Sequence, residues 1–245
     1  MNDAGFDNGP RIFATDRNLL GRSGYLAYLG INESELYNKS LFEIGLGSGT
    51  CLFDIASHNQ YCPDKRIKYT GTDVLLQIPD SELSEINKRR KQSLQVQVES
   101  HPSLFQSSNA AYGIHQSDNS YDFVISHLGM PEYANNSREV LNVIFEMIRV
   151  AKEKVAFSGG WEDKDNGGLN DGVYSFGGDD TFGKFPFKLK KLLDELSTVG
   201  ITYERVSSAY VQLDTRKKDM VRIKELHNNI ISRIEEYSPP DVRLL

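Results

Sequence analysis

The sequence predicts an α/β protein with a doubly wound, mainly parallel sheet of seven strands and an antiparallel hairpin toward its carboxyl terminus. Two observations lead to this fold class. Short apolar runs alternate along the chain with amphipathic helical patterns, which is typical of a parallel sheet with helices on both faces. The last two runs, 201–206 and 209–213, have no helix between them, so we expect them to pair antiparallel at one edge of the sheet.

The individual elements follow in order along the chain. Apolar residues between Thr15 and Leu29 recur with a spacing that predicts one or two short helices. Apolar, β-branched and aromatic runs predict strands at 40–44, 67–74, 103–106, 121–126 and 154–158. Amphipathic patterns predict helices at 51–58, 81–98, 137–151, 187–199 and 220–237. The alternating end of the second helix, LQVQVE, fits a strand as well.

These elements predict one main domain with extensions. We expect a tail and helical cap over 1–39, the main domain over 40–216, and within 217–245 a helix that packs on the domain or on a partner subunit, so a homodimer is possible. Residues 159–186 form an insertion with eight glycines and no clear periodicity. Loops of this length inside a compact domain are usually functional lids or disordered, and both interpretations apply here.

Composition and charge point to a cytoplasmic globular protein. Of the 245 residues, 39% are apolar, and the formal net charge of −6 argues against broad binding to nucleic acid or anionic membranes. No apolar run approaches the ~20 residues of a membrane-spanning helix, and the first residues lack the features of a secretory signal. Cys51 and Cys62 have neither metal-ligand spacing nor the numbers for a disulfide framework. We therefore expect reduced thiols and no metal site.

The stretch Phe42–Thr50, FEIGLGSGT, places three glycines directly after the first predicted strand. A glycine-rich turn from a strand into a helix lets a ligand lie against bare backbone at the positive end of the helix. The dinucleotide-binding pattern requires a glycine at its sixth position, where this chain has Thr50. No Lys-Ser or Lys-Thr pair follows, which excludes a nucleoside-triphosphate loop.

The pattern that the chain matches is acidic-x-Gly-x-Gly-x-Gly. Its acidic residue is Glu43, and its glycines are Gly45, Gly47 and Gly49. It resembles the first motif of the class I S-adenosylmethionine-dependent methyltransferases, which have a Rossmann-like fold. The resemblance implies S-adenosylmethionine as cofactor and S-adenosylhomocysteine as product, with the loop around the methionine and ribose part. A carboxylate at Glu43 suits the ammonium and sulfonium charges of this cofactor.

A second acidic residue extends this resemblance, which runs over about 40–213. Asp73 ends the second predicted strand, where a carboxylate can accept hydrogen bonds from both ribose hydroxyls. Val74 or Leu75 would then flank the adenine. The resemblance therefore implies that Asp73 and Val74 bind the cofactor.

A third stretch is similar to the family's approach to its next strands. Asn109 and Ala110 stand at the position of an Asp-Ala pair, and 119–122 reads Asn-Ser-Tyr-Asp where the family has Asn-Ser-Phe-Asp. The chain thus has an asparagine where an acid commonly receives the adenine amino group. The side-chain oxygen of Asn109 can still accept that hydrogen bond.

The residues just past the strand at 121–126 face the methyl group in this family. Here they begin with Ser126, predicted to contact the cofactor, and His127. His127 is the candidate catalytic base, because an unperturbed histidine titrates near pH ~6.5; alternatively it only packs beside the cofactor. The Asn/Asp-Pro-Pro-aromatic tetrad of amino-methylating nucleic-acid enzymes is absent, which counts further against a nucleic-acid substrate.

Four residues are candidates for contact with the methyl acceptor. Tyr133 follows the same strand, Trp161 opens the glycine-rich insertion, and Arg22 and Tyr25 belong to the amino-terminal cap. An arginine would suit a carboxylate or phosphate on the acceptor, although ordinary surface placement also explains it. The predicted function is methyl transfer to an oxygen or nitrogen of a small polar or aromatic metabolite. The alternatives are a protein or peptide side-chain methyltransferase and a non-catalytic protein that binds S-adenosylmethionine or another adenosine ligand.

Overall fold

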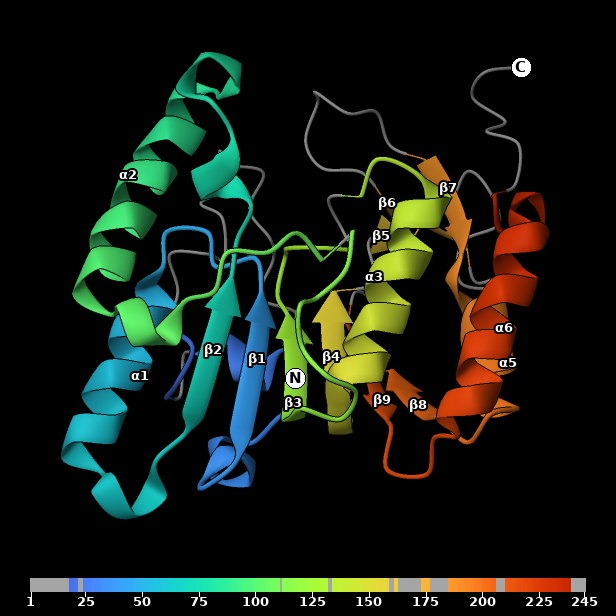
Figure 1. Ribbon diagram of the computed structural model, residues 1–245, viewed down its shortest axis with the longest axis horizontal. Helices are drawn as coiled ribbons and strands as arrows, with labels where there is room; N and C mark the ends of the chain where they lie inside the picture. Colours follow the sequence, from blue (N-terminus) through green and yellow to red (C-terminus); the bar gives the residue numbers. More distant parts are fainter. Residues whose placement is uncertain are drawn as a thin grey trace, which may run out of the picture.

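The computed structural model describes residues 18–21, 24–110, 112–131, 134–158, 161–162, 173–176, 185–205 and 210–238. Within them, six strands form one mixed sheet in the order β2-β1-β3-β4-β9-β8 (Figure 1). The first four are parallel, and β9 runs antiparallel to β4 and β8, so the mainly parallel sheet and its edge hairpin are confirmed. The bounds are β1 Ser40–Ile44, β2 Lys68–Thr72, β3 Tyr121–Ser126, β4 Ala151–Ser158, β8 Thr202–Arg205 and β9 Tyr210–Asp214.

The described sheet has six strands where the sequence predicts seven, and the difference lies at 103–106. This segment runs beside β2 but makes a single parallel bridge, between Gly71 and Phe105. The amide of Gln106 also donates to Gly71 O at 2.9 Å. The reason is local: Pro102 begins a 3-10 turn that extends to Leu104 and takes up the first part of the expected strand.

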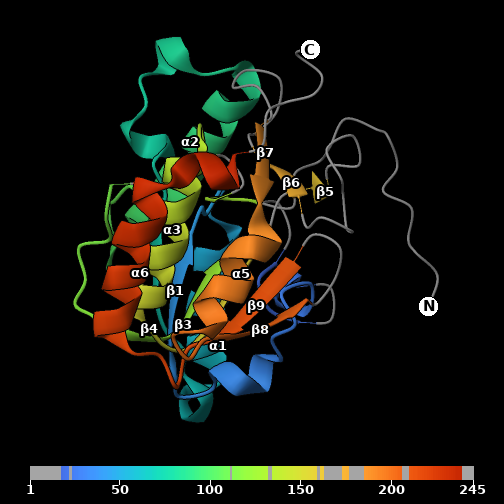
Figure 2. The same cartoon turned by 90° about the vertical axis from the view of Figure 1, so that its right-hand side faces the viewer.

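Helices cover both faces of the sheet (Figures 1 and 2). The α-helices are α1 Thr50–Tyr61, α2 Glu85–Ser100, α3 Ser137–Val150, α5 Leu189–Ser197 and α6 Met220–Ser232. The stretch LQVQVE lies within α2 and is therefore helical. The 3-10 turns are Tyr25–Ala27, Glu33–Leu36, Pro63–Lys65, Leu75–Gln77, Asp80–Glu82, Pro102–Leu104 and Ile234–Tyr237.

Side chains of successive strand residues enter two separate cores. Phe42 and Val124 are fully buried against α3, α5 and α6. Leu41, Phe123 and Ile125 lie in the other core, together with α1, α2 and the amino-terminal segment, by which we mean the described residues from 18 to 36. This alternation follows from the two-residue period of a strand. It explains why apolar residues stand next to each other in both strands, Leu41 and Phe42 in β1 and Phe123 to Ile125 in β3, as expected for strands covered on both faces.

The amino-terminal segment packs on the α1 face of the sheet, and the described part of the predicted helical region, 18–21 and 24–29, contains the short 3-10 turn Tyr25–Ala27 and no α-helix. Gly21 has a positive φ of 86°, and a Cβ on Gly24 would lie 2.4 Å from Leu19 O. The backbone therefore doubles back here instead of continuing a helix. The amide of Leu19 donates to Asp54 Oδ2 of α1 at 2.7 Å, which attaches the segment to the domain.

Part of the predicted insertion forms a second sheet. β5 Trp161–Glu162, β6 Val173–Phe176 and β7 Phe185–Lys188 pair antiparallel in that order. The helix predicted from 187 consequently begins at Leu189, after β7. Tyr174 and Phe187 are buried in the core that α3 and α5 share, so this sheet is joined to the domain. The rest of 159–186 lies outside the described residues.

The carboxyl-terminal helix α6 packs on α3. Ile223 and Ile230 are buried in the shared core. His227 stacks on Phe145 with ring centroids 4.4 Å apart, and its Nε2 lies 3.1 Å from Asn142 Oδ1.

Among the described residues, no helix is long and apolar enough to cross a bilayer, and no three His, Cys, Asp or Glu side chains gather as metal ligands.

Candidate cofactor and active site

The glycine turn joins the carboxyl end of β1 to the amino end of α1. Gly45, Gly47 and Gly49 all have positive φ, 86°, 57° and 80°, a backbone conformation that glycine adopts without a steric penalty. A Cβ on Gly49 would lie 3.0 Å from Leu94 Cδ1 of α2. The turn is therefore packed between β1 and α2, and its open side is the carboxyl edge of the parallel strands, where open α/β sheets bind ligands.

Gly45 also meets a second backbone segment. A Cβ on Gly45 would lie 2.9 Å from the Cα of Gly129, and a Cβ on Gly129 would lie 2.7 Å from Ile44 O. Ser126 Oγ donates to the same Ile44 O at 2.9 Å. The segment after β3 thus lies directly on the end of β1. The glycine at position 45 serves this contact between two backbones, in addition to any contact with a ligand.

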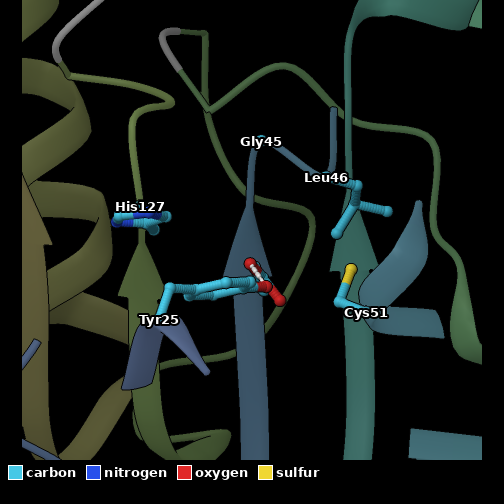
Figure 3. A pocket seen from close by; sticks show the side chains of 6 residues that line it. Tyr25, Gly45, Leu46, Cys51 and His127 are labelled. Atoms are coloured by element: carbon cyan, nitrogen blue, oxygen red, sulfur yellow. Dashed lines mark hydrogen bonds between the residues drawn. The ribbon is translucent and has the colours of Figure 1, made fainter. Parts of the chain in front are cut away.

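Glu43 lies at the centre of a buried hydrogen-bond network beneath the turn (Figure 3). Only 1% of its surface is exposed. One carboxylate oxygen accepts a hydrogen bond from the Tyr25 hydroxyl, and the other accepts one of 2.7 Å from the Tyr69 hydroxyl. The Tyr69 hydroxyl also lies 3.3 Å from Cys51 Sγ. Burial raises the pKa of Glu43 from 4.5 to about 7, although these hydrogen bonds favour the charged form.

A small pocket opens above this network. In Figure 3, Tyr25 and His127 lie on one side of it, Leu46 and Cys51 on the other, and Gly45 above the end of β1. Its lining thus combines a carboxylate, aromatic rings and glycine backbone, a set that can accept a cationic group. The lining residues are Tyr25, Glu43, Gly45, Leu46, Cys51 and His127.

His127 is held among aromatic rings at the end of β3. It is 3% exposed and stacks on Tyr25 with ring centroids 4.7 Å apart and planes inclined by 7°. Tyr28 and Tyr210 stack on the imidazole at 6.2 and 5.5 Å. Three rings therefore restrict the orientation of the imidazole, which faces the pocket from the side of β3.

Asp73 connects the end of β2 to the glycine turn. Its carboxylate accepts hydrogen bonds from the amides of Gly47 at 2.9 Å and Leu75 at 2.8 Å. Burial raises the pKa of Asp73, an effect opposed by these hydrogen bonds and by the charge of Arg90 on α2. Val74, half-buried, directly precedes the 3-10 turn Leu75–Gln77. Asp73 thus shapes the turn, a role that its sequence position does not reveal.

Hydrogen bonds between the Thr72 hydroxyl and the backbone of Ser108 bring Asn109 and Ala110 to the same edge of the sheet. The Thr72 hydroxyl donates to Ser108 O at 2.8 Å, and the amide of Ser108 donates back to Thr72 Oγ1 at 3.0 Å. Because Thr72 ends β2, this pairing places Asn109 near Asp73. Asn109 is half-buried, whereas Ala110 is 2% exposed and packs in the α3 core.

The residues predicted for the acceptor are only partly described. Arg22, Tyr133 and the side chain of Trp161 lie outside the described residues. Tyr25 is described, and it contacts Glu43 and His127. Their roles toward the acceptor remain predictions, as do the cofactor contacts of the residues gathered at the strand ends.

Three residues that the motif analysis does not single out contribute to the site: Tyr69, Cys51 and Gly129. Tyr69 reaches Glu43 because Gly71, two residues on, is the β1–β2 register partner of Glu43. The local signal for Gly129 is a glycine three residues after an apolar strand, which on its own also fits a turn. Register and crossover geometry, which bring these residues to Glu43 and Gly45, are properties of the folded sheet.

No family model matches the sequence, and no curated protein matches it. Solved structures that resemble it include magnesium protoporphyrin IX methyltransferase from Synechocystis PCC 6803 with bound S-adenosylhomocysteine, at 18% identity and a TM-score of 0.44 over 78% of each chain. The CcbJ methyltransferase from Streptomyces caelestis is 14% identical, with a TM-score of 0.46 over 82% of this chain and 93% of that one. Phosphoethanolamine N-methyltransferase 1 from Haemonchus contortus is 11% identical, with a TM-score of 0.47, and the match covers 86% of this chain but 47% of that protein.

Proposed function

We propose that this protein binds S-adenosylmethionine and transfers its methyl group to an oxygen or nitrogen of a small polar or aromatic metabolite. One observation carries the proposal: Glu43, the glycine turn and Asp73 converge on the carboxyl edge of the sheet, beside a pocket that His127 faces. The spacing of these residues in the sequence matches the first two motifs of the class I methyltransferases. The acidic net charge also favours a small metabolite over a nucleic acid.

The residues at this edge fit the parts of the cofactor. The pocket beside Glu43 offers a carboxylate for an ammonium group, and the aromatic rings of Tyr25 and His127 are favourable neighbours for a cation. The carboxylate of Asp73 has lone pairs beyond those that its two amide donors use, so it can also accept ribose hydroxyls. Val74 follows Asp73, and Asn109 follows Ser108, which pairs with Thr72 at the end of β2, so both are our candidates for contact with the adenine.

The chain's own contribution to methyl transfer is mainly positioning. S-adenosylmethionine supplies an activated methyl group, because its sulfonium leaves as the neutral sulfide of S-adenosylhomocysteine. The glycine turn and the segment after β3 confine the pocket to one side of the sheet edge, and confinement of this kind lowers the entropic cost of an in-line displacement. His127 stands at the end of β3, where its imidazole can take the proton that a hydroxyl or ammonium acceptor loses.

Calorimetric titration with S-adenosylmethionine, S-adenosylhomocysteine and NADH tests the proposal. We expect the first two ligands to bind and NADH to bind far more weakly. Replacing Asp73 with asparagine should weaken S-adenosylhomocysteine binding by about tenfold or more, because hydrogen bonds to a charged acceptor contribute about 1.5–3 kcal/mol. The asparagine keeps the size of the side chain, and its one acceptor oxygen can accept from one of the two amides, of Gly47 or of Leu75, that donate to separate oxygens of Asp73.

The matched control is Asp80→Asn. Asp80 is an exposed aspartate seven residues further on, and it pairs with Lys91 at 2.7 Å. Its replacement should leave binding unchanged. A preference for NADH, or equal affinities in the wild type and the Asp73→Asn variant, would contradict the proposal. Binding without turnover across a broad panel of hydroxyl and amine acceptors would instead favour a non-catalytic adenosine-ligand protein.

A further inference from the structure

Tyr25 contacts both Glu43 and His127. Its hydroxyl donates to Glu43 Oε1, and its ring stacks on His127 with centroids 4.7 Å apart and planes inclined by 7°. Only 4% of its surface is exposed. In Figure 3 the Tyr25 side chain reaches from below His127 toward β1.

The backbone on both sides of Tyr25 is attached to the domain. Its amide donates to Asn18 O at 3.0 Å, next to Leu19, whose own amide donates to Asp54 of α1. On the other side, Gln212 Nε2 of β9 donates to Leu29 O and Gly30 O, each at 3.0 Å. Fixed at both ends, this segment holds the Tyr25 ring in one place relative to the strands that carry Glu43 and precede His127.

We infer that Tyr25 is a positioning residue of the cofactor site: its hydroxyl orients the carboxylate of Glu43 for a ligand ammonium group, and its ring orients the imidazole of His127. The inference rests on the proposed function for the identity of the ligand. It gives the amino-terminal segment a defined task, which is to align the two functional groups that flank the pocket. Tyr69 shares only the first half of this task, because it donates to Glu43 without stacking on His127 in the described contacts.

The hydroxyl of Tyr25 also affects the charge of Glu43. Its hydrogen bond and that of Tyr69 lower the pKa of Glu43, while burial and the charge of Asp54 raise it, to about 7 in balance. Glu43 is thus partly protonated at neutral pH and attracts an ammonium group fully only above pH 7. The groups that face it are Tyr25 from the amino-terminal turn, Tyr69 from β2, Cys51 and Asp54 from α1, and His127 from the end of β3.

Three variants separate the two tasks. Tyr25→Phe removes the hydroxyl and keeps the ring, Tyr25→Leu removes both, and Tyr69→Phe removes the other hydroxyl donor to Glu43. Calorimetry with S-adenosylhomocysteine between pH 5.5 and 8 should show affinity rising through about pH 7 in the wild type. In Tyr25→Phe and Tyr69→Phe, the rise should move upward by about one pH unit, which corresponds to about fivefold weaker binding at pH 7. 5′-Methylthioadenosine, which lacks the amino-acid part, should bind the wild type and these two variants equally at every pH.

Nuclear magnetic resonance tests the second task without any ligand. Loss of the Tyr25 ring shifts the His127 resonances by itself, so the readout is the set of nuclear Overhauser contacts from the His127 ring protons to the rings of Tyr28 and Tyr210, which stack on the imidazole at 6.2 and 5.5 Å. These contacts should change in Tyr25→Leu and be preserved in Tyr25→Phe and Tyr69→Phe. An unchanged pH dependence in Tyr25→Phe, or unchanged His127 contacts in Tyr25→Leu, overturns the inference. If the wild type binds neither S-adenosylhomocysteine nor 5′-methylthioadenosine, the proposed function fails, and the contacts still decide whether Tyr25 positions His127. Far-ultraviolet circular dichroism confirms that each variant is folded.

Discussion

Replacing Glu43 with glutamine is expected to stabilise the protein at pH 8 while weakening its affinity for S-adenosylhomocysteine. The pKa of Glu43 is about 7 in the folded protein against an ordinary value of 4.5. Below pH 4.5 the carboxyl is neutral in both states and costs nothing. Between pH 4.5 and pH 7 the unfolded chain loses this proton while the folded protein keeps it, so stability falls over this range, by about 3 kcal/mol at 1.36 kcal/mol per pH unit, and the full loss is present above pH 7. Glutamine removes the buried charge and keeps one oxygen, to which the hydroxyl of Tyr25 or of Tyr69 can donate, while its amide group can donate to the other hydroxyl oxygen.

Urea unfolding of both proteins at pH 5 and pH 8 measures this effect. The free energy of unfolding of Glu43→Gln, relative to the wild type, should increase by about 2 kcal/mol or more between the two pH values. Glu99→Gln, at an exposed residue of α2, should show no such difference. Calorimetry at pH 8 should show S-adenosylhomocysteine binding about tenfold more weakly to Glu43→Gln, with 5′-methylthioadenosine unaffected. A stability difference between the two proteins that does not depend on pH would show that folding does not raise the pKa of Glu43.

The second large effect is expected at Gly45. Alanine there must adopt a φ of 86° and place its Cβ 2.9 Å from the Cα of Gly129. A left-handed conformation costs about 1–2 kcal/mol, and overpacking against backbone, which cannot rotate away, adds about 1–3 kcal/mol. We therefore expect Gly45→Ala to lower the free energy of unfolding by roughly 3 kcal/mol. Because the alanine pushes β1 and the segment after β3 apart, cofactor affinity should fall by about tenfold or more.

Gly21 provides a control with the same backbone geometry. Its φ is also 86°, but a Cβ there would meet nothing within 4 Å. Gly21→Ala should cost only the conformational part, about 1–2 kcal/mol, and should leave cofactor affinity unchanged. Urea unfolding and calorimetry of the two variants therefore isolate the contact between Gly45 and Gly129. Equal losses of stability in both variants would show that the backbone at Gly129 moves aside at little cost, which would contradict the importance of its close contact with Gly45.

Much of the fold follows from local patterns. The strands at β1 and β3 are predicted because short, mostly apolar runs with adjacent apolar residues suit strands covered on both faces. The helix α3 is predicted from its apolar stripe and from polar residues at its start, and Asn136 indeed caps it by accepting from the amide of Glu139 at 3.0 Å. These features depend on residues a few positions apart, so the sequence alone is sufficient.

Other features differ from the prediction because nearby residues or distant contacts outweigh the pattern. The expected strand at 103–106 is reduced to one bridge by the turn that begins at Pro102. In the described part of the region between Thr15 and Leu29, a turn at Tyr25–Ala27 replaces the expected helix, because the backbone doubles back at Gly24. In both places an apolar pattern correctly indicates burial, and the backbone geometry of one residue decides the element.

For the candidate site, the sequence by itself determined where the glycine turn lies and which acidic residues end the neighbouring strands. A positive φ favours glycine, and the carboxyl ends of parallel strands meet at one edge, so both features can be predicted from residue type and order. Only the tertiary structure decided the state of those residues. Glu43 receives its two hydroxyl donors from a segment 18 residues earlier and a strand 26 residues later. Burial and long-range partners set the charge of a carboxylate, and they exist only once the chain is folded.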